Sequence, residues 1–476
     1  MVAKATKEKT KNKIKPDLCR VFYLLLPIFI YIFKKNINMS KINVLVLPSD
    51  RTGVSKFRSV EPHLKLQELY SDNFHVDIIT AGSTDLNWDD ESFLKKYDII
   101  HFHRTLPLVQ NGVSRQVYLE EFNQLHDKIK SYGIITIMDL DDYWAPTKEH
   151  PAYQMIVNDK LPHKIKENLK RVDYVTTTTT IFAKEISKLN NNVIVLPNAI
   201  DPEEKQFKPK VKESSKSIRF GWLGGSSHLH DLKLMSPSVL QFLKENKENS
   251  QFVLCGFDTR GNITEIDRNT GQQRTRKIKP EESVWSRYEE MFTDNYKLIQ
   301  EDDVVNLKKY DRELDESSSK DGIYRRVWTK PITTYASNYN LFDVSMAPLK
   351  EHDFNKYKSQ LKVIESGFHK KALIAQNYGP YQIDCVNLFE YGGKINEMGN
   401  AILVDSHKNH KDWYKAMKKL KDNPSLVELL VNNLNQTVNQ KYHLDIVTKK
   451  RSEFYQSLMK DNKKEVEQLI EETNAI

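Results

Sequence analysis

Short β-branched and aliphatic runs alternate with amphipathic stretches from residue 39 onward, and this rhythm constrains the fold more than any other feature. The first six runs cover residues 42–48, 75–80, 97–103, 133–140, 173–179 and 193–198. Near-continuous apolar runs of this length, separated by helical patterns, are typical of strands buried on both faces of a parallel sheet. The sequence therefore predicts an α/β domain over residues 39–200.

The same rhythm restarts after a lysine-rich linker, residues 201–217. Five further predicted strands lie within residues 218–405, at 218–225, 251–257, 342–349, 372–377 and 401–404. Residues 258–330 interrupt this second domain as an insertion, in which Asn269-Thr270-Gly271 predicts a hairpin turn. Residues 406–476 show only helical patterns. We therefore predict two facing Rossmann-like parallel-sheet domains and a helical C-terminal tail.

The positive charge of the chain is concentrated at its N-terminus. Residues 1–41 carry ten Lys and Arg against Glu8 and Asp17, an excess equal to the whole formal net charge of +8. The remaining residues, 42–476, therefore have no net charge. Because nucleic-acid-binding domains usually carry a basic excess, we predict no nucleic-acid partner.

The leader, residues 1–38, permits three interpretations. Its apolar run, residues 21–33, is shorter than the roughly 17–25 residues of a membrane span. In the first, Met39, directly before the first strand, is the natural start. In the second, the leader is a weak anchor that makes peripheral contact with the inner membrane face, and in the third it is a signal peptide.

Cys19, Cys255 and Cys385 are too scattered for a disulfide framework or a metal site. We therefore expect a cytoplasmic protein without a structural metal.

Polar residues follow the predicted strands of the first domain, where open parallel sheets bind their ligands. Gly53 and Ser55 follow the first strand, in a loop suited either to an anion or simply to a tight turn. Of His101 and His103 we expect only one to face the cleft. Asp141 and Asp142 follow the fourth strand and could bind sugar hydroxyls or a cation, or cap a helix.

Two segments of the second domain carry candidate donor-binding residues. Gly224, Gly225, Ser226 and His228 follow a strand, in a loop that could cradle a phosphate or serve as a tight crossover. Lys358, Lys362 and Glu365 fall at i, i+4 and i+7 of one predicted helix, whose apolar stripe is Leu361, Ile364 and Phe368. Such a polar face could bind a diphosphate and a ribose, or be a solvated face with an ordinary salt bridge.

Several stretches, taken in order, resemble the group 1 glycosyltransferases, which are nucleotide-sugar-dependent enzymes of the retaining type with the GT-B fold. The features that carry the resemblance are GVSKFRS, DIIHFH, DYVTTTTTIFAKEI, VIVLPNAIDP, RFGWLGGSSHLHDL, FDVSMAPL and FNKYKSQLKVIESGFHKKALIAQNYGPY. The last matches the subgroup spelled FNxxKSxLKxIE. The resemblance spans about residues 42–460 and implies transfer of a sugar to an acceptor hydroxyl, in polysaccharide or glycoconjugate synthesis.

The resemblance also implies residue roles. Lys362 holds the donor diphosphate, Glu365 binds the nucleotide ribose, and Gly379 with Pro380 shapes the loop near the donor sugar. His103 is the cleft-facing histidine and, with Lys362 and Glu365, a catalytic candidate. The donor-binding candidates are Gly53, Ser55, Gly224, Gly225, Ser226, His228, Lys358, Ser359, Gly379 and Pro380, and the acceptor or cleft candidates are Arg58, Asp141 and Asp142.

One departure from the family concerns the partner of Glu365. The family often has a second glutamate eight residues before it, where this chain has Tyr357. Lys358 and Ser359 are the residues expected to compensate. We expect a metal-free reaction without a cofactor, in which the nucleotide-sugar is a co-substrate and the acceptor is a glycan or lipid-linked glycan. Two alternatives stay open: a nucleotide-sugar epimerase of the same architecture, and a non-catalytic interaction protein that binds through residues 258–330.

Overall fold

The structure is a computed structural model of the chain. It describes residues 41–50, 53–80, 83, 85–110, 113–150, 153–210, 215–258, 261–266, 273–293, 322–405, 411–460 and 463–474. The leader, residues 1–38, lies outside these ranges, so its three interpretations stay as predictions. Within the described ranges, no helix combines the length and the apolar character needed to cross a membrane.

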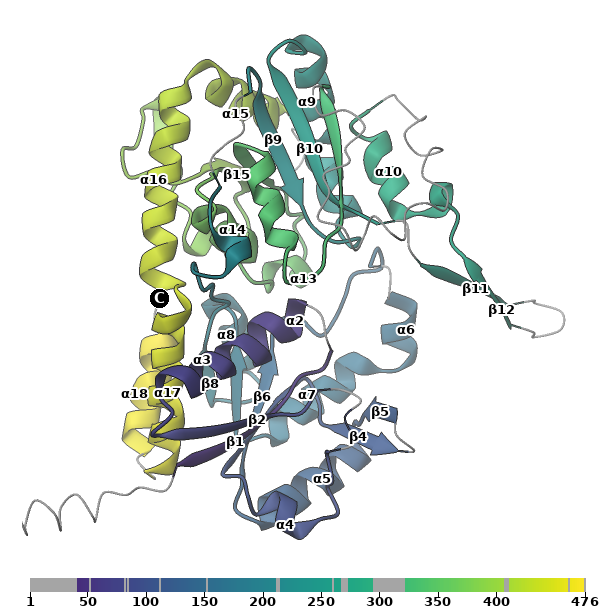
Figure 1. Ribbon diagram of the computed structural model, residues 1–476, viewed down its shortest axis with the longest axis vertical. Helices are drawn as coiled ribbons and strands as arrows, with labels where there is room; N and C mark the ends of the chain where they lie inside the picture. Colours follow the sequence, from purple (N-terminus) through teal and green to yellow (C-terminus); the bar gives the residue numbers. More distant parts are fainter. Residues whose placement is uncertain are drawn as a thin grey trace, which may run out of the picture.

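The first domain is built on a six-stranded parallel sheet, as the sequence predicts. Its strands are β1 (Ile42–Leu47), β2 (Phe74–Ile78), β3 (Ile99–His103), β6 (Ile135–Leu140), β7 (Tyr174–Thr177) and β8 (Val193–Val195). They lie in the order β2-β1-β3-β6-β7-β8. Helices cover both faces of the sheet (Figure 1). They are α2 (Gly53–Ser55), η1 (Lys56–Val60), α3 (Glu61–Leu69), α4 (Glu91–Leu94), α5 (Glu120–Ser131), α6 (Tyr153–Asn158), α7 (Leu161–Arg171) and α8 (Thr180–Ile186).

The second domain repeats this architecture with six more parallel strands, in the order β13-β10-β9-β14-β15-β16. The strands are β9 (Ile218–Leu223), β10 (Ser250–Phe257), β13 (Tyr324–Trp328), β14 (Val344–Ala347), β15 (Ala372–Gln376) and β16 (Ile402–Val404). The sequence predicts the other five, whereas β13 falls inside the segment interpreted as an insertion. It pairs with β10 and is the edge strand of the sheet.

The helices of the second domain lie on both sides of its sheet (Figure 1). Those in the described ranges are η2 (Lys205–Phe207), α9 (Leu229–Glu245), η3 (Pro280–Glu282), α10 (Val284–Glu290), η4 (Tyr335–Leu341), α13 (Asp353–Lys356), α14 (Leu361–Phe368), η5 (Gly379–Ile383), η6 (Tyr391–Gly393), α15 (Lys411–Asp422) and α16 (Pro424–Lys441). The described strands of the expected hairpin, β11 (Asn262–Ile266) and β12 (Gln273–Lys277), pair antiparallel. The predicted turn residues, Asn269-Thr270-Gly271, lie outside the described residues. A second hairpin, β4 (Pro107–Gln110) and β5 (Val113–Gln116), was not expected from the sequence.

The C-terminal helices connect the two domains. Helices α15 and α16 pack on the second domain, and the chain then returns to the first domain in α17 (Leu444–Met459) and α18 (Lys463–Asn474) (Figure 1). At the crossing, the Ile200 N–H donates to the carbonyl of Tyr442 over 2.9 Å. On the first domain, the hydroxyl of Tyr455 lies 2.9 Å from His63 Nε2. The tail is therefore part of both cores rather than an appendage.

Candidate functional site

A cavity of about 800 Å³ lies between the two domains. Its walls come from the carboxyl ends of β6 and β8 and from α2 and η1 in the first domain, and from the ends of β9, β10 and β13 with α14 in the second. This is the edge at which open parallel sheets bind ligands. The residues predicted from the sequence that line it are Gly53, Arg58, Asp141, Asp142, Gly224, Gly225, His228, Lys358, Ser359, Lys362 and Glu365.

Lys358, Lys362 and Glu365 do not share one helix, so this part of the prediction is wrong. Helix α13 ends before Tyr357 and α14 begins at Leu361, which leaves Lys358 in the turn between them. The physical reason is the environment of Tyr357: its ring packs into the core of the first domain, and its hydroxyl donates to Glu185 over 3.1 Å. The turn nevertheless brings all three side chains to the cavity.

Two contacts hold the ammonium of Lys362 in the cavity wall. Its ammonium donates to the carbonyl of Leu223 at the end of β9 and lies 5.2 Å from the centre of the Trp222 ring. Burial lowers the pKa of Lys362 to about 8. Lys330, which follows β13, also lines the cavity and was missed because β13 was missed. Together with Lys358, these lysines form a triad, called below the cavity lysines, suited to a diphosphate.

The lowered pKa of Lys362 predicts how donor binding depends on pH. A bound diphosphate favours the protonated amine, so binding takes up a proton once the pH exceeds the free pKa of about 8. Below that pH the donor Kd is expected to be constant, and above it to rise by up to about tenfold per pH unit. His228, whose pKa is lowered to about 4 by burial, stays neutral throughout. Calorimetric titrations from about pH 7 to pH 9.5 check this, and a constant Kd would contradict it.

Glu365 lies beneath the cavity with two tyrosine hydroxyls on its carboxylate. Tyr335 donates to one oxygen and Tyr339 donates to the other over 2.9 Å. Burial raises the pKa of Glu365 although both hydroxyls and Lys362 oppose the shift. Tyr335 itself lines the cavity, and no feature of the sequence pointed to it. Each carboxylate oxygen can accept a further hydrogen bond, so the ribose contact stays a prediction.

The glycine-rich turn after β9 requires its glycine at 224. A Cβ on Gly224 would lie 2.4 Å from the Trp222 ring and 3.1 Å from Lys362 Nζ. Gly225 and His228 line the cavity as expected, whereas Ser226 does not and Ser227 takes that place. The neutral His228 donates from Nδ1 to Asp231 over 2.7 Å. This turn therefore places Gly224 beside Lys362 in the cavity wall.

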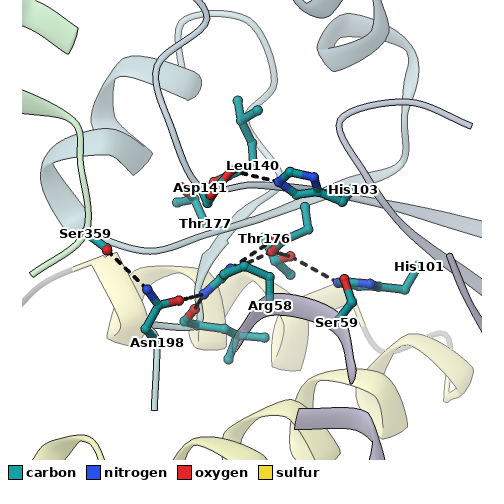
Figure 2. Close-up of polar contacts among 12 residues, drawn as sticks. Arg58, Ser59, His101, His103, Leu140, Asp141, Thr176, Thr177, Asn198 and Ser359 are labelled. Atoms are coloured by element: carbon teal, nitrogen blue, oxygen red, sulfur yellow. Dashed lines mark hydrogen bonds and ion pairs between the residues drawn. The ribbon is translucent and has the colours of Figure 1, made fainter. Parts of the chain in front are cut away.

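His103 does not face the cavity, contrary to prediction. Its ring is buried, and its Nδ1 lies 2.7 Å from the Ser49 hydroxyl. Its Nε2 lies 2.7 Å from Asp141 (Figure 2). His101 is also buried, beside His63. Residues two apart on a strand share a face, so the expectation that only one of the two could face the cleft used the wrong periodicity. His103 can therefore influence a ligand in the cavity only through its contact with Asp141.

Asp141 and Asp142 form the carboxylate wall of the first domain. Arg104 lies 3.0 Å from Asp141 and 3.7 Å from Asp142. Burial opposes ionisation of Asp141, but Arg104 and His103 outweigh it and lower its pKa. Burial and the charge of Asp141 raise the pKa of Asp142. Asp142 therefore forms the weaker ion pair with Arg104, and it is the more basic of the two carboxylates.

Arg58 is engaged by the protein rather than available to a substrate. Its guanidinium donates twice to Asp139, over 3.0 and 2.7 Å, and once to Asn198 Oδ1 over 3.2 Å. Figure 2 shows Asn198 between Arg58 and Ser359, to whose hydroxyl its amide donates over 3.1 Å. Asn198 belongs to the VLPNAIDP motif, but its side chain was not singled out. These two hydrogen bonds of Asn198 join the first domain to the turn that carries Lys358.

Three further predicted residues lie beside the cavity without lining it. Ser55 lies within α2 rather than in a loop, and its hydroxyl accepts the N–H of Asp50 over 3.1 Å. Gly379 has a φ of +58°, and a Cβ there would lie 3.1 Å from Lys356 Cα. With Pro380 it begins η5, which presents Tyr381 to the cavity. Gly379 and Pro380 therefore support the wall indirectly.

Within the described ranges, no three His, Cys, Asp or Glu side chains are grouped so that they could hold a metal ion. Asp139 is paired with Arg58, which separates it from the neighbouring carboxylates Asp141 and Asp142. Three lysines, Lys330, Lys358 and Lys362, line the cavity. Metal independence stays a prediction.

No protein-family model and no curated protein sequence matches the chain. Solved structures do. A glycosyltransferase from Rickettsia africae aligns over 89% of this chain and 100% of its own, with a TM-score of 0.53 and 12% identity. Sucrose-phosphate synthase from Thermosynechococcus elongatus aligns over 88% and 99%, with a TM-score of 0.53 and 11% identity. HepE from Anabaena, in complex with UDP and glucose, aligns over 88% and 99%, with a TM-score of 0.51 and 8% identity. These likenesses establish a two-domain GT-B fold.

Proposed function

We propose that this protein is a glycosyltransferase that moves a sugar from a nucleotide-sugar donor to an acceptor hydroxyl. The observation that carries the proposal is the cavity between the two domains, where the cavity lysines and Glu365 meet at the carboxyl ends of the strands. The chain has the GT-B fold, and one similar structure, that of HepE, is in complex with UDP and glucose. Both findings support this choice. An epimerase of the same architecture would use the same donor cavity without an acceptor.

The geometry suggests how the leaving group is stabilised. Negative charge grows on the nucleoside diphosphate as its bond to the sugar breaks, and we propose that the cavity lysines, which line the donor cavity, stabilise that charge. Glu365, fixed by two tyrosines, would orient the ribose. The reaction we propose needs no metal, because the lysines supply the positive charge. Retention of the anomeric configuration is proposed on the resemblance to group 1 enzymes.

The acceptor would bind against the first domain, where Asp141 and Asp142 face the cavity. Carboxylates accept hydrogen bonds from hydroxyls and repel anions, which favours the hydroxyl-bearing end of a glycan or lipid-linked glycan. We propose a role in polysaccharide or glycoconjugate synthesis in the cytoplasm, with peripheral contact at the inner membrane face.

The donor is tested by thermal-shift and calorimetric binding of the full chain to UDP-, GDP-, ADP- and TDP-sugars. Stabilisation by one nucleotide class, lost in Lys362→Ala, is expected. A folded protein that binds none of these donors would overturn the assignment and favour a non-catalytic interaction protein. Product analysis with donor alone separates the remaining alternative, since an epimerase converts the donor sugar without an acceptor.

Asp142→Asn tests the acceptor side. Asparagine keeps the shape of Asp142 but is a weaker acceptor for a hydroxyl hydrogen and cannot take its proton. We expect kcat to fall by about 10²-fold, as for loss of a positioned acid–base group, while the donor Kd stays unchanged. Steady-state kinetics with separate donor titrations check this. A variant with a normal kcat and a normal acceptor KM would exclude Asp142 from the acceptor site.

A further inference from the structure

A second cavity, of about 220 Å³, lies at the seam between the domains and is separate from the donor cavity. The cavity is enclosed by the end of β7 with the start of α8, the end of β8, the residue before α14, η5, the crossing from α16 to α17, and α18. Its walls include Thr178, Thr179, Thr180, Val195, Pro197, Gln360, Ile383, Lys441, Tyr442, Ile446, Lys450 and Thr473. None of these residues lines the donor cavity.

Thr178 and Gln360 line the seam cavity, and each has a buried side-chain oxygen, Thr178 Oγ1 and Gln360 Oε1, without a hydrogen-bond partner among the described residues. Thr178 is fully buried and Gln360 is 2% exposed. The orientation of the Gln360 amide follows from its neighbours. Tyr442 donates to Asp384 over 2.5 Å and so accepts from Gln360 Nε2 over 2.8 Å, which leaves Oε1 free. Buried polar atoms are normally paired, so we expect each of these two oxygens to form a hydrogen bond with a bound molecule.

The charged side chains of the cavity are cationic. Lys450 makes no ion pair with any residue in the described ranges, whereas Lys441 lies 3.0 Å from Asp384 Oδ1. Pro197, Ile383, Ile446 and the Tyr442 ring supply apolar surface. An occupant that suits these groups donates a hydrogen bond to Gln360, exchanges one with Thr178, carries negative charge toward Lys450 and has an apolar face.

We propose that the seam cavity binds a small hydroxylated anion of the sugar phosphate class. Sugar hydroxyls both donate and accept, which satisfies Gln360 Oε1 and Thr178 Oγ1, while the phosphate pairs with Lys450. The ring C–H groups pack on the apolar wall. The volume suits one phosphorylated monosaccharide and is far below that of the donor cavity. The site does not depend on the proposed transfer reaction.

The test is calorimetric titration of the full chain with glucose 1-phosphate, glucose and inorganic phosphate. Thr178→Val removes the unpaired hydroxyl with little change in volume, so the fold is expected to keep its stability. Lys450→Gln removes the cation, and Lys449→Gln, on the same helix and 69% exposed, is the matched control. Lys362→Ala reports on binding in the donor cavity.

Glucose 1-phosphate is expected to bind the wild type and Lys362→Ala equally, with a Kd about tenfold weaker in Thr178→Val and in Lys450→Gln and unchanged in Lys449→Gln. Glucose and phosphate alone are expected to bind much more weakly. The proposal is overturned if glucose 1-phosphate does not bind at about 10 mM. It is equally overturned if binding is lost in Lys362→Ala but kept in Thr178→Val and Lys450→Gln, or if inorganic phosphate binds as well as the sugar phosphate.

Discussion

Replacing Lys362 by alanine is expected to lower kcat by about 10²–10³-fold, the usual cost of removing one preorganised group that stabilises transition-state charge. The Leu223 carbonyl and the Trp222 ring hold the ammonium of Lys362 in place. We therefore expect that neither Lys358 nor Lys330 can move into the same position and compensate for its loss. Donor affinity is expected to fall about tenfold to a hundredfold, because a charge-assisted hydrogen bond to the diphosphate is lost. Donor titration and steady-state kinetics measure the two effects separately.

The fold should survive this change. Burial lowers the pKa of Lys362, which means that the charged amine is disfavoured where it lies, and its removal costs little stability. The thermal midpoint is therefore expected to stay constant or to rise. Lys356→Ala is the control, since Lys356 is exposed on the neighbouring α13 and does not line the cavity. Near-normal turnover by Lys362→Ala, with the control also normal, would exclude Lys362 from the reaction.

Glu365→Ala is expected to reduce stability and donor affinity together. The substitution leaves the hydroxyls of Tyr335 and Tyr339 without their acceptor in a buried site, at about 1–3 kcal/mol for each unpaired group. The ribose would also lose its carboxylate. Denaturant unfolding measures the first effect, and calorimetric donor binding the second, for which we expect a loss of about tenfold or more.

Glu365→Gln separates these two effects. The amide keeps a hydrogen-bonding group for both tyrosines, so most of the stability is expected to return. Donor affinity is expected to stay below that of the wild type, because a neutral amide oxygen accepts less strongly than a carboxylate. If both variants bound the donor normally, the ribose contact would be wrong and Glu365 would only support η4 through its tyrosines.

The sequence predicted the strands well because each is a short apolar run bounded by polar turns. All six strands of the first sheet and five of the second were found this way. The exception, β13, reads YRRVW, and its two arginines disguise a strand whose five residues are all buried. Burial of arginine at an edge strand depends on partners such as Glu289, which lies 37 residues away from Arg326 in the sequence. Local pattern cannot reveal such a partner.

The candidate site was predicted in part. Glycines after strands and the Lys–Glu pattern of α14 pointed to the cavity because their positions follow from strand ends and helical spacing. Tyr335 was missed because it lies in a segment with no chemical pattern of its own, and Lys330 because it follows the missed strand β13. Asn198 lies in a motif found in the sequence, but nothing local marks its side chain as one that reaches the cavity. His103 and Ser55 were expected in the cavity, but burial and local hydrogen bonds turn them into supporting residues.

The sequence by itself determined the two parallel sheets and the residue types at the carboxyl ends of the strands, because hydrophobic period and turn residues are local properties. Only the tertiary structure decided which of those residues face the cavity. Tyr357 shows the reason: its ring is drawn into the core of the first domain, which ends α13 and places Lys358 in a turn. The seam cavity likewise exists only because α17 and α18 return to the first domain, a contact between residues more than 250 positions apart.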